Sequence, residues 1–287
     1  MALVNFREML AKASAEHYAV GMFDVSDLEM ARAVVQEAEK LRAPVILGAL
    51  GPDLEGDRLE YWFAVAELAA KKSSMPVCIH LDHANTLEEV MRAAKIGFTS
   101  VMLDASASPF EENVRRTREV VDALKGRDIT VEAELGHVGN GWVGSGEGSE
   151  SGPDKLTEPE KVAEFVERTG VDALAVSIGT AHGVYVKAPK LDIARLEKIT
   201  EVSRIPLVLH GGSGTPEDQM ADAIAHGISK VNIFSELLTA WNASLLAELK
   251  ATPHLAVWPG ILRKKPDAAM REVIRHKIQF FGSSGRY

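Results

Sequence analysis

The sequence predicts a single (β/α)8 TIM barrel over residues 1–287, with additional helices at its C-terminal end. Three observations favour this fold. Eight short apolar segments have the character of strands, and helical patterns separate them, which is typical of parallel strands joined by crossover helices. Their spacing is regular, and no linker or shift in composition divides the chain. Most of these strands end at a polar residue, as barrel strands do where they open on a site.

The first half of the chain begins with a helix over residues 4–16, where Phe6, Met9 and Leu10 recur at helical spacing. Apolar runs that end at polar residues predict the strands that follow, and apolar residues three or four positions apart predict the helices. The expected order is strand 18–23, helix 28–41, strand 45–50, helix 59–72, strand 76–83, helix 87–95 and strand 100–103.

The second half continues the alternation. A glycine-rich loop over residues 136–152 is longer than most connections, and such loops in compact domains are usually functional. We expect a helical region at the end of the chain with a break between its prolines. The expected order is helix 111–124, strand 129–133, helix 158–169, a strand from 173 that leads to His182, strand 206–209, strand 230–234 and helices over 236–281 with a break at 253–259.

The composition argues against nucleic-acid-binding, secreted and membrane proteins. A formal net charge of -9 argues against a general nucleic-acid binder. The N-terminus has no signal-peptide pattern, and no apolar run approaches the roughly 20 residues of a membrane span, so we expect a cytoplasmic protein without a membrane partner. The one cysteine, Cys78, lies in an apolar strand and is predicted to be a small buried hydrophobe.

Polar residues occur where the predicted strands end. In a barrel the carboxyl ends of all strands face one mouth, so side chains scattered over the chain are expected to converge there. These residues are Asp24, Asp82, His83, Asp104, Glu134, His182, His210 and Asn232.

Three of these residues predict a metal centre. His83, His182 and His210 end the third, sixth and seventh strands, and three imidazoles with one open position are typical of a catalytic zinc site. Nitrogen ligands favour Zn²⁺ over Mg²⁺, although they do not separate Zn²⁺ from Co²⁺ or Fe²⁺. Any one histidine taken alone could instead be a hydrogen-bonded core residue. His80 should point to the same face as Asp82 but one layer deeper, so we expect it to be structural.

The acidic residues have two possible roles each. Asp82 follows the alternation of its strand to the side opposite His83, so it is expected to be a poor metal ligand. A carboxylate beside a metal-bound substrate is a natural proton donor or acceptor, and the alternative is that Asp82 orients a ligand. Asp104 and Glu134 are expected to orient the histidines, or else to form an alternative metal position.

A turn of small residues follows the seventh strand. Gly211, Gly212 and Ser213 offer backbone N–H groups and a hydroxyl before a helix start, which together favour an anion. Barrels commonly bind phosphate on the loops after strands seven and eight, and Asn232 with Ser235 lies on the second of these loops.

These motifs resemble the class II, metal-dependent ketose-bisphosphate aldolases, which include fructose- and tagatose-bisphosphate aldolases. The similarity spans almost the whole chain and is carried by residues 80–83 (HLDH), 100–106 (SVMLDAS), 131–136 (VEAELG), 179–183 (GTAHG), 209–214 (LHGGSG), 230–233 (KVNI) and 281–285 (FGSSG). The resemblance implies a lyase that cleaves a ketose bisphosphate to dihydroxyacetone phosphate and an aldehyde, and a homodimer or homotetramer.

The resemblance also implies roles for particular residues. His83, His182 and His210 would bind Zn²⁺, often with a monovalent cation such as Na⁺ or K⁺ nearby, and Asp82 would be the catalytic acid and base. The dihydroxyacetone phosphate half would be held by Gly183, Gly211, Gly212, Ser213, Asn232, Ile233, Phe234 and Ser235.

Several positions depart from the family pattern. Phe234 replaces a carboxylate of the fructose-type members, and Asp24 stands where an asparagine is usual. A hydroxyl that helps to bind the distal phosphate is missing near Leu50. The loop acid that moves the C3 proton is Glu147 or Glu150, or is missing. The loss of that hydroxyl and the gain of Asp24 together indicate a substrate whose far end is not a phosphate.

Three hypotheses follow. The first is a zinc-dependent aldolase, acting on a ketose bisphosphate or on a ketose phosphate without a distal phosphate. The second is a non-catalytic subunit that binds sugar phosphates, which the altered loop favours and the retained histidines oppose. The third is a zinc isomerase or epimerase that uses Asp104 and Glu134 as opposed acids.

Overall fold

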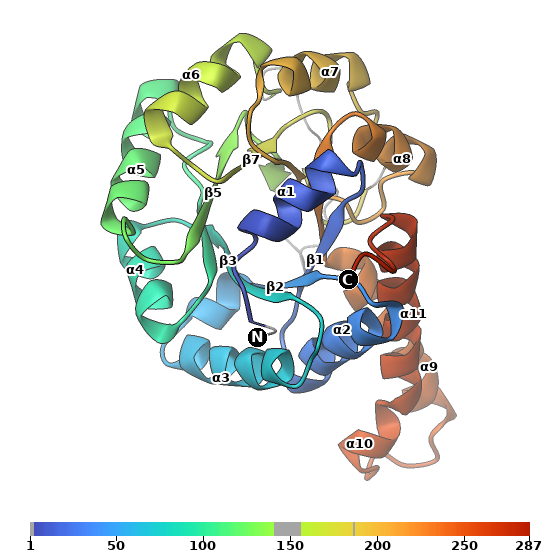
Figure 1. The fold of residues 1–287 in the computed structure, drawn as a ribbon. Helices are drawn as coiled ribbons and strands as arrows, with labels where there is room; N and C mark the ends of the chain where they lie inside the picture. The colour runs from blue at the N-terminus through green and yellow to red at the C-terminus, as the bar shows by residue number, and fades with distance from the viewer. Residues whose placement is uncertain (1–2, 141–155, 186) are drawn as a thin grey trace.

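The structure is a computed structural model that describes residues 3–140, 156–185 and 187–287. Eight parallel strands close into a barrel with helices around it, so the predicted barrel is confirmed (Figure 1). Around the barrel the strands follow the order β1-β10-β9-β7-β5-β4-β3-β2. They are β1 (Val20–Asp24), β2 (Val45–Ala49), β3 (Val77–Ala84), β4 (Ser100–Leu103), β5 (Thr130–Leu135), β7 (Ala173–Val176), β9 (Leu207–Leu209) and β10 (Ile228–Ile233).

Helices connect the strands and cover the outside of the barrel (Figure 1). Local signals start several of them: the Asp27 side chain accepts a hydrogen bond from the Met30 N–H, and Thr86 forms a capping box with Glu89. Around the ring lie α2 (Leu28–Leu41), α3 (Arg58–Lys71), α4 (Leu87–Ile96), α5 (Phe110–Ala123), α6 (Pro159–Thr169), α7 (Ile193–Val202) and α8 (Glu217–Ala225), with a 3-10 turn η1 (Gly51–Leu54) before α3. None of the described helices is both long and apolar enough to cross a membrane.

The sixth barrel strand is shorter than predicted. We expected it to lead directly to His182, whereas β7 ends at Val176. His182 instead lies on β8 (Ala181–His182), which pairs in parallel with β6 (Gly139–Asn140) in a separate two-stranded sheet. The intervening Gly179 has a φ of +117°, which permits the change of direction that ends the longer strand.

The helix α1 (Arg7–Ala15) closes the amino-terminal end of the barrel (Figure 1). Its residues Met9 and Leu10 and the preceding Phe6 are buried against side chains that point into the barrel, among them Met22 and Cys78. A larger apolar cluster fills the space between the strands and the outer helices. The barrel is therefore packed at one end and opens only at the carboxyl ends of its strands.

The last part of the chain forms α9 (Ser235–Ala251), α10 (Pro259–Leu262) and α11 (Lys264–Phe280), as the sequence predicts. Helix α11 packs on α2, where the buried carboxylate of Glu37 pairs with Arg271 and Arg275 at 3.1 Å. Helix α10 lies at the tip of this segment, away from the barrel (Figure 1). Leu255 and Trp258 near the tip are 80% and 76% exposed, so the tip carries an uncovered apolar surface.

Candidate metal centre and catalytic pocket

A bulge at the end of β3 determines where Asp82 and His83 point. His83 has a φ of +49°, and the pairing of β3 with β4 shifts register between Leu81 and Ala84. Such an irregularity interrupts strict alternation, so consecutive side chains no longer point to opposite faces. Asp82 and His83 therefore both line the pocket at the barrel mouth. The expectation that Asp82 lies on the other side of the strand end from His83 is wrong for this reason.

The three predicted histidines lie together at the mouth. The ring centroids of His83 and His182 are 4.8 Å apart, those of His83 and His210 are 4.7 Å apart, and those of His182 and His210 are 5.6 Å apart. One nitrogen from each ring lies within 4.8 Å of the other two. Strands whose first residues, Val77 and Ala181, are more than 100 positions apart in sequence thus bring three imidazoles within reach of one ion.

Carboxylate groups contact the ring nitrogens of two of these histidines. His83 Nδ1 lies 2.9 Å from Asp104 Oδ2, which leaves Nε2 on the pocket side. His210 is buried and contacts two carboxylates: Nδ1 lies 2.9 Å from Glu134, and Nε2 lies 2.9 Å from Glu132. A contact of this kind fixes the ring orientation and tautomer of a metal-binding histidine, as for His83. At His210 both ring nitrogens face carboxylates, so one of these two contacts must give way for a nitrogen to bind an ion.

The charge of the surroundings suits a cation. Burial lowers the pKa of His83, but the nearby carboxylates of Asp82 and Asp104 outweigh this effect and raise it to about 10. Burial, with His83 close by, holds the pKa of His182 well below its usual value, so this imidazole is neutral and can act as a ligand. The carboxylates that favour a proton on His83 also favour a metal cation in the place of that proton.

The side chains present at this centre fit a metal ion. His83 Nε2 is buried and has no hydrogen-bond partner among the described residues, and a ligated cation would satisfy it. The set of three nitrogen donors is the set that Zn²⁺ prefers at an open site. Asp104 and Glu134, with His83, form a further group close enough to share an ion.

Asp82 lies beside the metal centre and is almost fully buried. Its oxygens lie 3.7 Å from His80 Nε2 and 3.9 Å from His83 Nε2, and the Asn232 amide donates to them at 3.4 Å. Burial raises the pKa of Asp82, but the positive charge of His83 and the contact with His80 lower it well below its usual range. Asp82 is therefore an ionised carboxylate at neutral pH, able to accept a proton.

A buried ion pair below the pocket was not predicted from the sequence. Lys230 and Glu132 are fully buried inside the barrel, with Lys230 Nζ 3.0 Å from Glu132 Oε2 and 2.8 Å from Asn232 Oδ1. Since Glu132 also contacts His210 and Asn232 contacts Asp82, this pair links the metal centre to the carboxylate. The sequence does contain a signal for this pair. Charged or amide residues two positions apart in an apolar strand, such as Glu132 and Glu134, point to the same face of the strand, which predicts a polar group inside the barrel.

The pocket at the mouth has a volume of about 600 Å³. The described residues that line it include these predicted site residues: Asp82, His83, Asp104, His182, Gly183, Gly211, Ser213, Asn232, Phe234 and Ser235. His210 and Glu134 lie buried at its base. Gly212 and Ile233 do not line it: Gly212 packs against Val231, and Ile233 lies in the outer apolar cluster. Glu147 and Glu150 lie outside the described residues.

The predicted anion turn is formed where the loops after β8, β9 and β10 meet. Gly211 has a φ of +65°, and a Cβ there would lie 2.3 Å from the Ala181 carbonyl oxygen, so only glycine fits. The Ser213 hydroxyl accepts a hydrogen bond from the Phe234 N–H at 3.0 Å, which ties the turn to the start of α9. Ser213 and Ser235 thus lie at the amino-terminal end of a 17-residue helix, where anions are stabilised.

A closed barrel with titratable groups and imidazoles gathered at its open end is the arrangement of a barrel enzyme, and these side chains could hold a metal ion. Residues 4–286 match the family model described as fructose-bisphosphate aldolase class-II. The chain therefore belongs to the class II fructose-bisphosphate aldolase family and is a lyase. This membership supports a lyase over the non-catalytic subunit and the isomerase that the sequence left open.

Relatives of known name agree with this assignment. A 6-phospho-5-dehydro-2-deoxy-D-gluconate aldolase of Bacillus licheniformis is 38% identical, over 100% of this chain and 97% of that protein. The crystal structure of the YdjI aldolase from Escherichia coli K12 is 34% identical, with a TM-score of 0.86 and 99% of both chains covered. The fructose-bisphosphate aldolase of Campylobacter jejuni, 22% identical over 100% and 97% of the two chains with a TM-score of 0.83, shares the fold.

Proposed function

We propose that the protein is a zinc-dependent aldolase that reversibly cleaves a phosphorylated ketose to dihydroxyacetone phosphate and an aldehyde. The observation that carries this proposal is the meeting of three imidazoles beside the ionised carboxylate of Asp82. The Bacillus licheniformis relative, an aldolase whose named substrate is a phosphorylated sugar acid, supports the same class of reaction.

The proposal assigns the metal to His83, His182 and His210, with Asp104 and Glu134 orienting two of the rings. A Lewis-acidic Zn²⁺ held there would stabilise the negative charge that develops on the three-carbon fragment as the C3–C4 bond breaks. A monovalent cation near the phosphate remains a prediction from the family resemblance.

Asp82 is assigned the proton transfer at the C4 hydroxyl. In cleavage its carboxylate accepts the proton of that hydroxyl, and in condensation it returns the proton to the aldehyde oxygen. The Asn232 amide, which donates to both Asp82 oxygens, holds the carboxylate toward the pocket. Because His80 and Asn232 already contact Asp82, its orientation is set before substrate binds.

The phosphate of dihydroxyacetone phosphate is assigned to the turn that contains Gly211 and Ser213 and to the start of α9 at Ser235. The helix dipole and the hydroxyls of Ser213 and Ser235 favour an anion at this position. Gly183, from the loop after β8, completes this side of the pocket.

The test is carbon–carbon bond formation. Zinc-loaded protein is incubated with dihydroxyacetone phosphate and a panel of aldehydes, and the ketose phosphate product is measured. Replacing Asp82 by Ala should lower turnover on the order of 100-fold or more and leave the zinc content unchanged. Asp128→Ala, which removes an exposed acid far from the mouth, is the matched control. No product with any aldehyde would contradict the aldolase proposal, and normal turnover of Asp82→Ala would remove its role.

We also propose that the protein is a cytoplasmic homodimer or homotetramer. The exposed apolar tip around Leu255 and Trp258 supports self-association, because apolar surface of this kind is usually covered in an assembly. Light scattering coupled to size-exclusion chromatography measures the mass directly, and a monomer at micromolar concentration would contradict this part of the proposal.

A further inference from the structure

The part of the pocket formed by the loops after β1 and β2 differs in chemistry from the phosphate side. It contains Asp24, the last residue of β1, and Asp53 from the turn η1. Among the described residues that line this pocket there is no lysine and no arginine. The described residues of this part of the site therefore offer carboxyl oxygens, and neither a lysine nor an arginine, to whatever part of the substrate it receives.

Asp24 has an unsatisfied buried atom. Its side chain is only 4% exposed, and Oδ1 has no hydrogen-bond partner among the described residues. The carboxyl lies over Gly48 of the neighbouring strand, where a Cβ would come within 2.3 Å of Oδ1, so the glycine makes room for it. A buried acceptor without a partner is costly, and a donor on a ligand would remove that cost.

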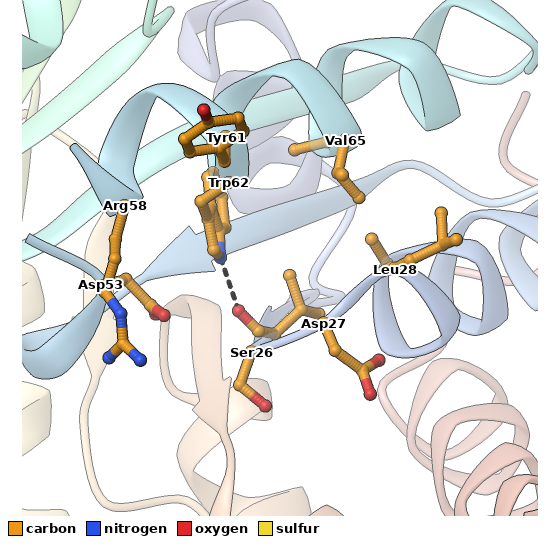
Figure 2. Close-up of a pocket in the computed structure, with 11 residues that line it drawn as sticks. Ser26, Asp27, Leu28, Asp53, Arg58, Tyr61, Trp62 and Val65 are labelled. Atoms are coloured by element: carbon orange, nitrogen blue, oxygen red, sulfur yellow. Dashed lines mark hydrogen bonds between the residues drawn. The ribbon is translucent and has the colours of Figure 1, made fainter. Parts of the chain in front are cut away.

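Asp53 lies next to this position and opens onto a second cavity. The side pocket between α2 and α3 has a volume of about 490 Å³ and shares Val25, Ser26 and Asp53 with the catalytic pocket. Figure 2 shows Asp53 and Arg58 near each other in this side pocket, across from Leu28. Burial raises the pKa of Asp53 overall, although a hydrogen bond from the Leu50 N–H and the charge of the Arg58 guanidinium lower it, so Arg58 is close enough to Asp53 to interact with it.

We propose that Asp24 and Asp53 receive the aldehyde half of the substrate and select an aldehyde that carries free hydroxyl groups and no phosphate. The inference rests on the aldolase function proposed above, because only that function places an aldehyde beside Asp82. A hydroxyl group can donate to the unsatisfied Oδ1 of Asp24, whereas a phosphate dianion brings acceptors and negative charge to two carboxyl groups.

The state of Asp24 is compatible with this role. Burial, and then the negative charge of Asp82, raises the pKa of Asp24 well above its usual value. An added phosphate charge would lie against Asp82 in the same pocket and would be disfavoured for the same electrostatic reason.

The experiment compares two aldehydes with one carbon skeleton. Zinc-loaded protein condenses dihydroxyacetone phosphate with D-glyceraldehyde or with D-glyceraldehyde 3-phosphate, and kcat/KM is measured for each; malonate semialdehyde tests a carboxylate in place of the phosphate. We expect kcat/KM for glyceraldehyde to exceed both others by about 10-fold or more. Asp24→Asn and Asp53→Asn should each reduce this preference by several-fold, mainly by raising kcat/KM for the phosphorylated aldehyde.

Asp57→Asn is the matched control, since Asp57 is an exposed acid between η1 and α3 that lines neither cavity, and its preference should equal that of the wild type. Asp53 is only partly buried, unlike Asp24, so its variant tests the inference even if Asp24→Asn is poorly folded. A preference for either anionic aldehyde, or an unchanged preference in both folded variants, would overturn this inference and leave the aldolase function intact. No product with any aldehyde would overturn both.

Discussion

The buried pair of Lys230 and Glu132 makes stability sensitive to one substitution. Lys230→Met keeps a side chain of similar length but removes the ammonium group, which lies 3.0 Å from one Glu132 oxygen and 3.2 Å from the other. Both residues are fully buried, so Glu132 would be left as a buried carboxylate without its cation. Removing one partner of such a pair typically costs about 3–5 kcal/mol, which for a chain of this size lowers Tm by about 10 °C.

A double-mutant cycle separates this cost from the loss of packing. Glu132→Gln removes the second charge, so the variant with both substitutions should be more stable than Lys230→Met alone, with a coupling of about 2 kcal/mol. The control is Lys161→Met, which breaks a pair with Glu158 whose side chains are 40% and 53% exposed and should cost less than about 0.5 kcal/mol.

The assay is thermal and urea unfolding followed by circular dichroism at a fixed Zn²⁺ concentration, because bound metal itself stabilises the folded state. A free energy of unfolding for Lys230→Met within about 1 kcal/mol of the wild type would refute the reasoning. So would a double variant whose loss equals the sum of the two single losses, since the two residues would then not be coupled.

Three further predictions concern the metal and the C-terminal helix. Asp104→Asn should weaken Zn²⁺ binding about 10- to 100-fold through the loss of its contact with His83, as measured by competition with a chromogenic chelator. Exhaustive chelation should abolish turnover, and added Zn²⁺ should restore it; full activity at undetectable metal content would exclude a metal requirement. Burial raises the pKa of Glu37, but hydrogen bonds from Lys40, Arg271 and Arg275 outweigh this effect and lower the pKa overall. The ionised Glu37 therefore stabilises the folded state above the pKa of the unfolded chain, and this contribution is lost as the pH falls through the lower pKa of the folded state. Glu37→Gln should therefore lower Tm at pH 7, and the difference should shrink below about pH 4; an equal difference at both pH values would contradict this.

The gathering of distant side chains at the mouth could be expected from the sequence because it follows from topology. Parallel strands in a closed barrel end at one face, whatever the details of packing, so His83 and His210 had to lie near each other once the strands were recognised. The same logic applies to Asp104, which directly follows β4 and contacts His83.

The direction of Asp82 could not be predicted, because alternation is a rule for regular strands. The left-handed backbone of His83 is unfavourable for a residue with a Cβ and persists only when tertiary contacts hold it. The place of His182 in a separate strand depends likewise on the pairing of β8 with β6, in which its partner Asn140 is more than 40 residues away. Neither contact can be inferred from the residues next to Asp82 or His182 in the sequence.

The helix α1 determines by which end ligands enter and leave the barrel. Phe6 and Leu10 fill the amino-terminal end of the barrel, with the ring of Phe6 6.0 Å from that of His80. Ions, protons and organic ligands must therefore all enter through the opening at the carboxyl ends of the strands. A substrate bound in that opening would block the exit of a metal ion bound deeper in the pocket. Saturating ketose should accordingly slow the escape of the bound ion and the isotope exchange of the His80 imidazole proton.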